Sequence, residues 1–253
     1  MYTKHTASAL ALAVAALTLA ACGGGDDDTA PPVPCSGAGC GAGGGSGTVA
    51  AAILPAVIDF DAREELLRPG ATVPLQVELE DARDHDVSDP AATNVQLAIL
   101  ADATGGAQLS ASQLSTRRGQ ANFSITLGVG LGTVIVKATT DRIDNNIANG
   151  IADELSWLLG MVVTQQGDGL NWELPAVVEM GAGGTARLED ADDGRKPRSY
   201  TVTGAGGFTL ASCGDDVCLK VPAGAAAGSY AVTFTVSDAA GSQLAMPVSV
   251  VVR

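Results

Sequence analysis

The sequence has few basic residues, few aromatic residues and almost no histidine. Lysine and arginine number 14 against 28 aspartates and glutamates, which gives a formal net charge of −14. A chain this acidic is repelled by nucleic acid and by anionic lipid surfaces, so neither is expected as a partner. Aromatic residues make up only 4% of the chain. Few rings are therefore present for stacking against a sugar.

Histidine is too scarce to suggest a catalytic site. Only His85 lies beyond the apolar N-terminal run, and its neighbours in Asp81–Asp86 are mostly charged. A catalytic base needs an orienting group and a nearby nucleophile, whereas His85 lies in an apparent surface turn. A paired-carboxylate hydrolase is conceivable from the number of acids, but those acids cluster in turns. We expect no enzymatic activity.

The apolar run at the N-terminus is too short to span a bilayer, which takes about 20 residues. Lys4 precedes the run, and Ala7–Ala21 consists almost entirely of alanine, leucine and valine. A charged n-region, an apolar h-region and an exit of small residues predict a secretory signal over residues 1–21.

The end of this run, Leu19–Cys22, reads Leu-Ala-Ala-Cys and resembles the lipobox of bacterial lipoproteins. The resemblance implies that Cys22 is acylated, palmitate included, and becomes the first residue of the mature protein. Three acyl chains would make the membrane attachment effectively permanent. Gly23 and Gly24 follow the cysteine, and the sorting rule of that family then favours the outer membrane, with periplasmic or surface exposure left open. The alternative is an ordinary cleaved signal with a chance cysteine.

The composition of the rest of the chain indicates a short tether followed by two domains. Residues 22–52 are rich in glycine and proline and predict a flexible tether, with an end-to-end distance of about 30 Å. The remaining length is enough for two cores of about 100 residues each. We expect one domain at residues 53–155 and a second at residues 156–253.

Apolar residues alternate with polar ones along several short segments, such as Val73–Leu79, Ala121–Leu127 and Tyr230–Val236. Period two indicates a strand with one buried and one wet face. Turn signals, including Asp102–Gly106 and Gly128–Gly132, separate these segments. The pattern predicts an all-β protein made of antiparallel sandwiches, without a convincing amphipathic helix.

The first half resembles the bacterial immunoglobulin-like (Ig-like) domains of the invasin and intimin type. The resemblance depends on four segments: Val77–Ala82, Asn94–Leu97, Gly119–Ile125 and Gly132–Thr139. It implies a fold and an envelope setting, and it brings no known catalytic residue. More weakly, Ala227–Asp238 resembles the penultimate strand of an Ig-like or cadherin-like module. Tyr230 is there either a tyrosine-corner residue or a plain core aromatic.

Four cysteines besides Cys22 form two close pairs in the sequence. The spacing favours local disulfides between Cys35 and Cys40 and between Cys213 and Cys218. A metal site is disfavoured because no second CxxC-type pair or nearby histidine completes four ligands. The second pair lies between two alternating segments and is expected to close a hairpin.

Oxygen-bearing side chains concentrate where the two predicted domains join. Calcium takes 6–8 oxygen ligands and could stiffen such a joint. The same residue types also favour turns, because their side chains bond the backbone locally. The weak calcium candidates are Asp141, Asp144, Asn145, Asn146, Asn149 and Asp153. No other cofactor is expected.

These features predict a lipid-anchored envelope protein that binds a protein or glycan partner, or spaces one from the membrane, as in adhesion. The alternatives are a structural component of an envelope complex and a polysaccharide-binding module. Solvent-exposed Trp157 and Trp172 on one face would favour glycan binding. A partner strand could also add to Pro247–Arg253 if that strand lies at a sheet edge.

Overall fold

A computed structural model describes most of the chain from residue 56 onward. The described residues are 56–62, 67–83, 85–88, 93–141, 147, 154–188, 191–193, 196, 198–214 and 216–253. Strands dominate them, and none of these residues lies in an α-helix. Within this part of the chain, no helix has the length and apolar character needed to cross a bilayer. The prediction of an all-β fold made of antiparallel sandwiches is confirmed.

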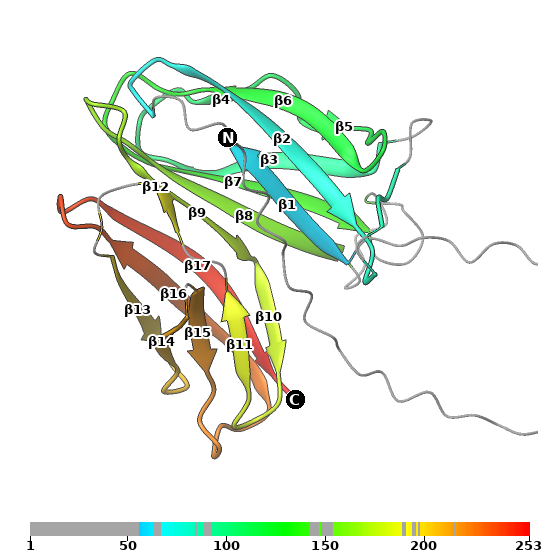
Figure 1. The fold of residues 1–253 in the computed structure, drawn as a ribbon, viewed down its shortest axis with the longest axis vertical. Helices are drawn as coiled ribbons and strands as arrows, with labels where there is room; N and C mark the ends of the chain where they lie inside the picture. The colour runs from blue at the N-terminus through cyan, green and yellow to red at the C-terminus, as the bar shows by residue number, and fades with distance from the viewer. Residues whose placement is uncertain are drawn as a thin grey trace, which may run out of the picture. The chain divides into compact units, whose positions relative to one another are not determined.

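Two sheets enclose the first core (Figure 1). Sheet 1 has the order β1 (Val57–Ala62), β2 (Thr72–Glu80), β6 (Gln120–Thr126) and β4 (Gln108–Leu109). Sheet 2 has the order β12 (Asp192–Asp193), β9 (Leu170–Pro175), β8 (Glu154–Val163), β7 (Gly132–Asp141), β3 (Val95–Asp102) and β5 (Gln113–Leu114). The alternation predicted in this half is confirmed, since Val73, Leu75, Val77 and Leu79 are all buried.

Two further sheets complete the second core. Sheet 3 has the order β10 (Val177–Met180), β17 (Gln243–Val252), β16 (Gly228–Ser237) and β13 (Ser199–Gly204). Sheet 4 has the order β11 (Thr185–Leu188), β15 (Asp216–Lys220) and β14 (Thr209–Cys213). Alternate residues of β15, β16 and β17 are buried in this core together with Trp172 of β9.

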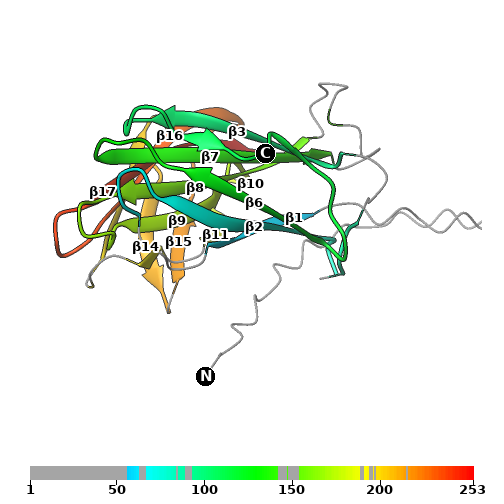
Figure 2. The ribbon, with the colours of Figure 1, turned by 90° about the horizontal axis from the view of Figure 1, so that it is seen from above.

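Strand β8 belongs to both cores. It pairs with β7 over its full length, from Gly132 opposite Val163 to Asp141 opposite Glu154, and the two strands run side by side in Figures 1 and 2. One face of β8 contributes Leu159 and Met161 to the first core, and the other contributes Leu158 to the second. The boundary proposed between residues 155 and 156 therefore falls inside a strand of the first sandwich.

The two cores meet closely at Gly160 of β8. A methyl group at this position would lie 2.7 Å from the sulfur of Met246 and 2.8 Å from a methyl carbon of Leu244. Both of these β17 side chains are fully buried. A side chain at this position would force the Met246 and Leu244 side chains to shift, so glycine favours the close approach of sheet 3 to sheet 2.

The C-terminal strand is not a free edge, so the hypothesis that it adds a partner strand is wrong. β17 pairs with β16 along ten residues, and Ser249–Val252 also pair in parallel with Val177–Met180 of β10. Both sides of this segment are therefore occupied within the protein, and no backbone row is left for a partner.

Tyr230 of β16 has the contacts of a tyrosine corner. Its hydroxyl donates to the carbonyl oxygen of Ala226 over 2.8 Å, a bond back to the backbone a few residues upstream. Its ring packs edge-on against Phe208, with 5.2 Å between the centroids. Tyr230 therefore combines both roles considered from the sequence. Its hydroxyl makes the tyrosine-corner bond, and its ring packs against the second core.

Candidate functional site

Two loops at one end of the first sandwich form a compact structure around Asp102. We call residues 103–107, after β3, and residues 128–132, which lead into the start of β7, the glycine-rich tip. The carboxylate of Asp102 accepts hydrogen bonds from the backbone N–H groups of Thr104, Gly105, Gly106 and Ala107. It also accepts one from the Thr104 hydroxyl over 2.6 Å. One side chain therefore fixes the course of the whole first loop.

Thr104 joins the two loops. Its hydroxyl oxygen accepts a hydrogen bond from the N–H of Gly128 over 2.9 Å, while it donates to Asp102. Its carbonyl oxygen accepts a second bond, from the N–H of Gly130 over 2.8 Å. The Thr104 side chain is buried, so these bonds are shielded from water and add to the rigidity of the tip.

The glycines of the second loop allow this close packing. A methyl group at Gly128 would lie 2.5 Å from the Thr104 hydroxyl oxygen, and one at Gly130 would lie 2.8 Å from the Thr104 carbonyl oxygen. Because every second residue from 128 to 132 is glycine and packs inward, the residues between them are directed outward. Val129 is 85% exposed and Leu131 is 51% exposed.

The hydrogen bonds to Asp102 also change its acidity. The Thr104 hydroxyl, followed by the backbone N–H of Ala107, lowers the pKa of Asp102 from 3.8 to about 2. A carboxyl group whose pKa is lower in the folded state stabilises that state above its unfolded pKa. The contribution is complete above pH 3.8 and is lost as the pH falls through about 2.

Replacing this carboxylate should weaken the fold in a pH-dependent way. Asp102→Asn removes one of the two acceptor oxygens, and we expect the free energy of unfolding at pH 7 to fall by about 2 kcal/mol. The difference from the wild type should shrink between about pH 4 and pH 2. Urea denaturation at pH 7, 4 and 2 measures it. Asp59→Asn, which removes an exposed carboxylate of β1, should cost less than about 0.5 kcal/mol at pH 7; equal losses would contradict the role of Asp102.

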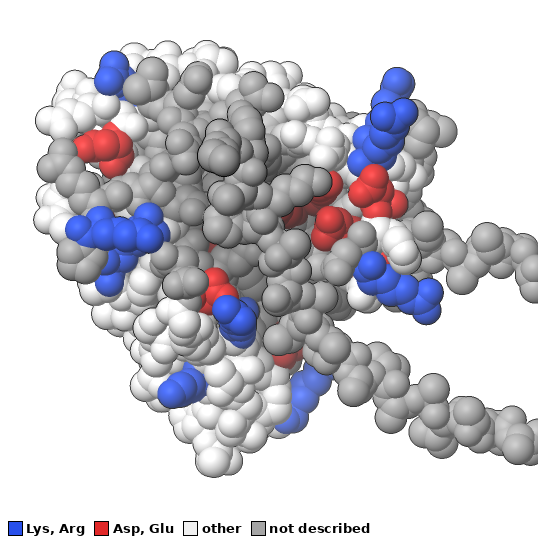
Figure 3. All heavy atoms as spheres, viewed as in Figure 1, with Lys and Arg blue, Asp and Glu red and all other residues white. Residues whose placement is uncertain are grey.

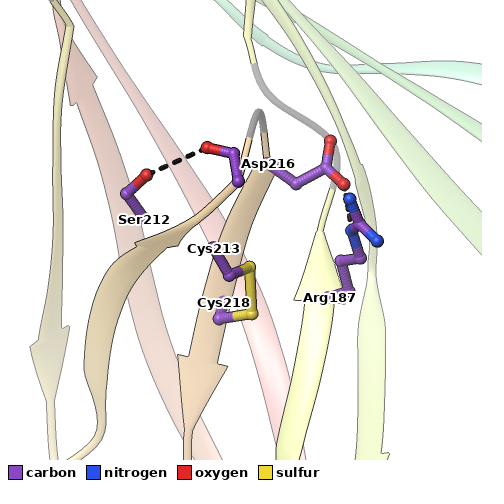
Figure 4. The surroundings of a disulfide bond; sticks show 6 residues. Arg187, Ser212, Cys213, Asp216 and Cys218 are labelled. Carbon is purple, nitrogen blue, oxygen red and sulfur yellow. Dashed lines mark hydrogen bonds and ion pairs between the residues drawn. A yellow bond between two sulfur atoms is a disulfide. The ribbon is translucent and has the colours of Figure 1, made fainter.

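The second cysteine pair forms a disulfide across the β14–β15 hairpin (Figure 4). Cys213 and Cys218 are bonded, with 5.8 Å between their Cα atoms. Arg187 of β11 forms an ion pair with Asp216 beside it, and the Ser212 hydroxyl donates to a backbone carbonyl of the turn. The bond joins the edge strand β14 to β15, the central strand of sheet 4.

Most of the other residues proposed from the sequence fall outside the described part of the chain. Cys22, Cys35 and Cys40 do so, and their acylation and pairing stay predictions. Of the six calcium candidates, only Asp141 is described; it is buried at the end of β7, opposite Glu154. In the described ranges, no group of three or more metal-ligating side chains comes together. Calcium binding at the joint stays a prediction.

The tryptophans do not form an exposed platform. Trp172 is 1% exposed and packs against Tyr200 and Phe234, with centroid separations of 5.3 Å and 6.4 Å. Trp157 is partly buried against the first core. The condition that would have favoured glycan binding is therefore not met.

His85 lies in a surface turn, as the sequence indicates. Its Nδ1 atom is 3.2 Å from a carboxylate oxygen of Asp81, and the same carboxylate accepts the backbone N–H of His85 and of Arg83. These bonds, that of the His85 N–H foremost, lower the pKa of Asp81. The contacts shape a turn around an exposed imidazole.

Charge is not collected at one place on the face of the molecule shown in Figure 3. On the face shown in Figure 3, the described basic and acidic side chains form small separate groups, with uncharged surface between them. The glycine-rich tip has no charged residue in either of its two loops. Turn signals mark both loops in the sequence. The regular Gly-x-Gly-x-Gly spacing from residue 128 is the signal that could have indicated outward-directed apolar side chains.

Comparisons with known proteins find distant structural likenesses. No protein-family model matches the chain, and no curated protein matches it. The D0–D1 domain of intimin is 16% identical, with 77% of this chain and 100% of that chain covered and a TM-score of 0.37. FdeC, an Escherichia coli adhesin, is 15% identical, with 79% and 66% covered and a TM-score of 0.29. Domains 5–6 of the S-layer protein SbsC are 13% identical, with 78% and 98% covered and a TM-score of 0.27.

These solved structures include the intimin type that the sequence resembles. At such identities and TM-scores they do not indicate what this chain binds. The architecture described above follows from the chain's own strand pairing and burial.

Proposed function

We propose that this chain is an envelope lipoprotein, acylated at Cys22, whose β-sandwiches act without catalysis to bind a partner or to hold it away from the membrane. The Leu19–Cys22 motif supports the anchor. The predicted tether over residues 22–52 supports presentation at a distance, because β1 begins only at Val57. The outer membrane is the proposed location, and a protein or a glycan is the proposed kind of partner.

The observation that carries the binding and spacing role is the sharing of β8 between the two cores. Moving one core against the other would break the ten-residue pairing of β7 with β8, or the packing of Gly160 against β17. A body of this kind holds its loops at fixed positions, as a spacer or a binding module must. Residues at the ends of such strands form the natural binding surface.

An assembly role in an envelope complex is the alternative that uses the same anchored body. Crosslinking and affinity capture from intact cells, together with protease shaving, separate the two roles. Recovery of a fixed set of envelope proteins would favour assembly, whereas cleavage from outside and binding to host matrix would favour adhesion. The polysaccharide alternative gains no weight from the tryptophans, because Trp172 is enclosed in the second core.

The anchor is tested by one substitution. Cys22→Ser should move the protein from the membrane fraction to the soluble fraction, because no thiol is left to carry the acyl chains. Mass spectrometry of the wild type should show a mature chain that starts at Cys22 and carries three fatty chains. Cys35→Ser is the matched control and should stay with the membrane. A wild-type protein that is already soluble and unmodified would overturn the proposal.

A further inference from the structure

We infer that the glycine-rich tip is a second membrane contact, at which Val129 and Leu131 enter the boundary between lipid headgroups and acyl chains. The inference rests on the proposed function, because an anchor at Cys22 is what keeps the tip close to a bilayer. The two residues are the exposed apolar side chains that the tip presents: of the four exposed large hydrophobic residues in the described ranges, two are in this loop.

The tip is ordered before any contact is made. Asp102 and Thr104 hold both loops through hydrogen bonds, and the space for side chains at Gly128 and Gly130 is already filled by the neighbouring loop. Because these bonds exist in the free protein, exposing Val129 and Leu131 to lipid requires no rearrangement. Ordering costs that usually weaken such contacts are thereby avoided.

Seven backbone N–H groups of the tip donate within the protein, and those of Val129 and Leu131 are left to bond water or lipid headgroups. Polar backbone groups that enter lipid must be bonded within the protein. Each N–H group of residues 103–107 donates internally: that of Ala103 to Thr133, and the others to the Asp102 carboxylate. The N–H groups of Gly128 and Gly130 donate to Thr104, and the carbonyl oxygen of Gly128 accepts from Gly70.

The chemistry of the tip fits lipid better than a protein partner. Binding hot spots in protein interfaces are enriched in tryptophan, tyrosine and arginine, whereas leucine and valine are under-represented. Two aliphatic side chains also cover far less than the roughly 800 Å² per partner of a standard interface. Neither loop contains a charged residue, and the Asp102 carboxylate beside them accepts five hydrogen bonds from the first loop, so the contact depends on burial of the apolar side chains and not on headgroup attraction. The chain's net charge of −14 favours zwitterionic over anionic lipid.

The chain that precedes the sandwich is long enough for this arrangement. Val57, where β1 begins, pairs with Glu80 at the opposite end of β2 from Thr72, and Thr72 pairs with Thr126 close to the tip. Strand β7 has ten residues, so about 30 Å separates the two ends of the sandwich. The tether has an expected end-to-end distance of about 30 Å. With the tip in the bilayer, Cys22 can still reach the same membrane.

The test places a reporter in the tip of vesicle-bound protein. The chain from residue 22 onward carries a histidine tag at its start and serine at positions 22, 35 and 40 (Cys22→Ser, Cys35→Ser and Cys40→Ser), so that the introduced cysteine is the only one outside the Cys213–Cys218 disulfide. It is bound to phosphatidylcholine vesicles that contain a nickel-chelating lipid. Leu131→Cys carries an environment-sensitive fluorophore, and Val177→Cys is the control, because Val177 is 48% exposed on β10. Lipids with a nitroxide on the acyl chain should quench the label at residue 131 at least twofold more than the label at residue 177.

Further variants and conditions identify the cause of the quenching. Val129→Ser should reduce the quenching at residue 131 by at least half while leaving the melting temperature unchanged, since residue 129 is exposed. Raising sodium chloride from 0.1 M to 0.5 M should change the quenching at residue 131 little, because the contact is apolar. Replacing a third of the lipid with phosphatidylglycerol should weaken the quenching at residue 131, because the acidic chain is repelled by an anionic surface.

Equal quenching at residues 131 and 177 would overturn the inference. So would a label at residue 131 that is shielded by an added envelope protein and not by lipid, which would assign the tip to a protein partner. Because the tag replaces the acyl chains, either result leaves the acylation of Cys22 to be decided by the fractionation of Cys22→Ser.

Discussion

Trp172→Ala is expected to lower the free energy of unfolding by about 4 kcal/mol. The indole is almost fully buried in the second core and packs against Tyr200 and Phe234. Its removal loses the transfer free energy of a large aromatic surface and leaves a cavity between sheets 2 and 3 that rigid strands can close only in part. Urea denaturation followed by circular dichroism measures the loss.

The second tryptophan is the matched control. Trp157 of β8 is only partly buried, at the margin of the first core, so Trp157→Ala should cost no more than about 2 kcal/mol. Because both variants affect sheet 2, which both cores share, we expect a single unfolding transition in each. Equal losses for the two variants, or two separate transitions, would contradict this account of the fold.

Gly169→Ala should destabilise the protein by at least about 3 kcal/mol. Gly169 lies in the turn between β8 and β9, and a methyl group there would overlap the carbonyl oxygen of Val162. The overlapping atom is backbone, so no side-chain rotation relieves it. The turn would have to open, and this would disturb the pairing of β8 with β9. That pairing extends from Trp157 opposite Pro175 to Met161 opposite Asn171.

A glycine in open space gives the comparison for this variant. Gly181 follows β10 and has no atom within 4 Å of the position that a methyl group would take. Gly181→Ala should therefore change stability by less than about 0.5 kcal/mol, with a small gain possible from the reduced entropy of the unfolded chain. Thermal unfolding of both variants measures the contrast. A Gly169→Ala protein as stable as Gly181→Ala would show that the β8–β9 turn tolerates a side chain.

Strands β2 and β6 of the first half could be predicted because each has one face exposed to water. In β2 and β6, apolar and polar residues alternate, and the buried set is the apolar set. The final strand alternates in the same way, and Val248, Val250 and Val252 are buried. The disulfide between Cys213 and Cys218 lies in a hairpin, as the alternation on either side of it indicated.

The candidate site was predicted only as two turns. Nothing in the local sequence shows that residues 103–107 and 128–132 meet, because their contact depends on the pairing of β3 with β7. Only that pairing brings Thr104 to Gly128 and leaves Val129 in solvent.

By itself, the sequence determined the acidic character of the chain, the period-two strands, the turns between them and the signal-like N-terminal run. Tertiary structure decided which strands are shared. β7 and β8 are buried on both faces, so they show no alternation that could assign a face to one core or the other. The apolar–polar pattern of a strand indicates whether one or both of its faces are buried. Which sheet covers each face is decided by contacts between residues far apart in the chain.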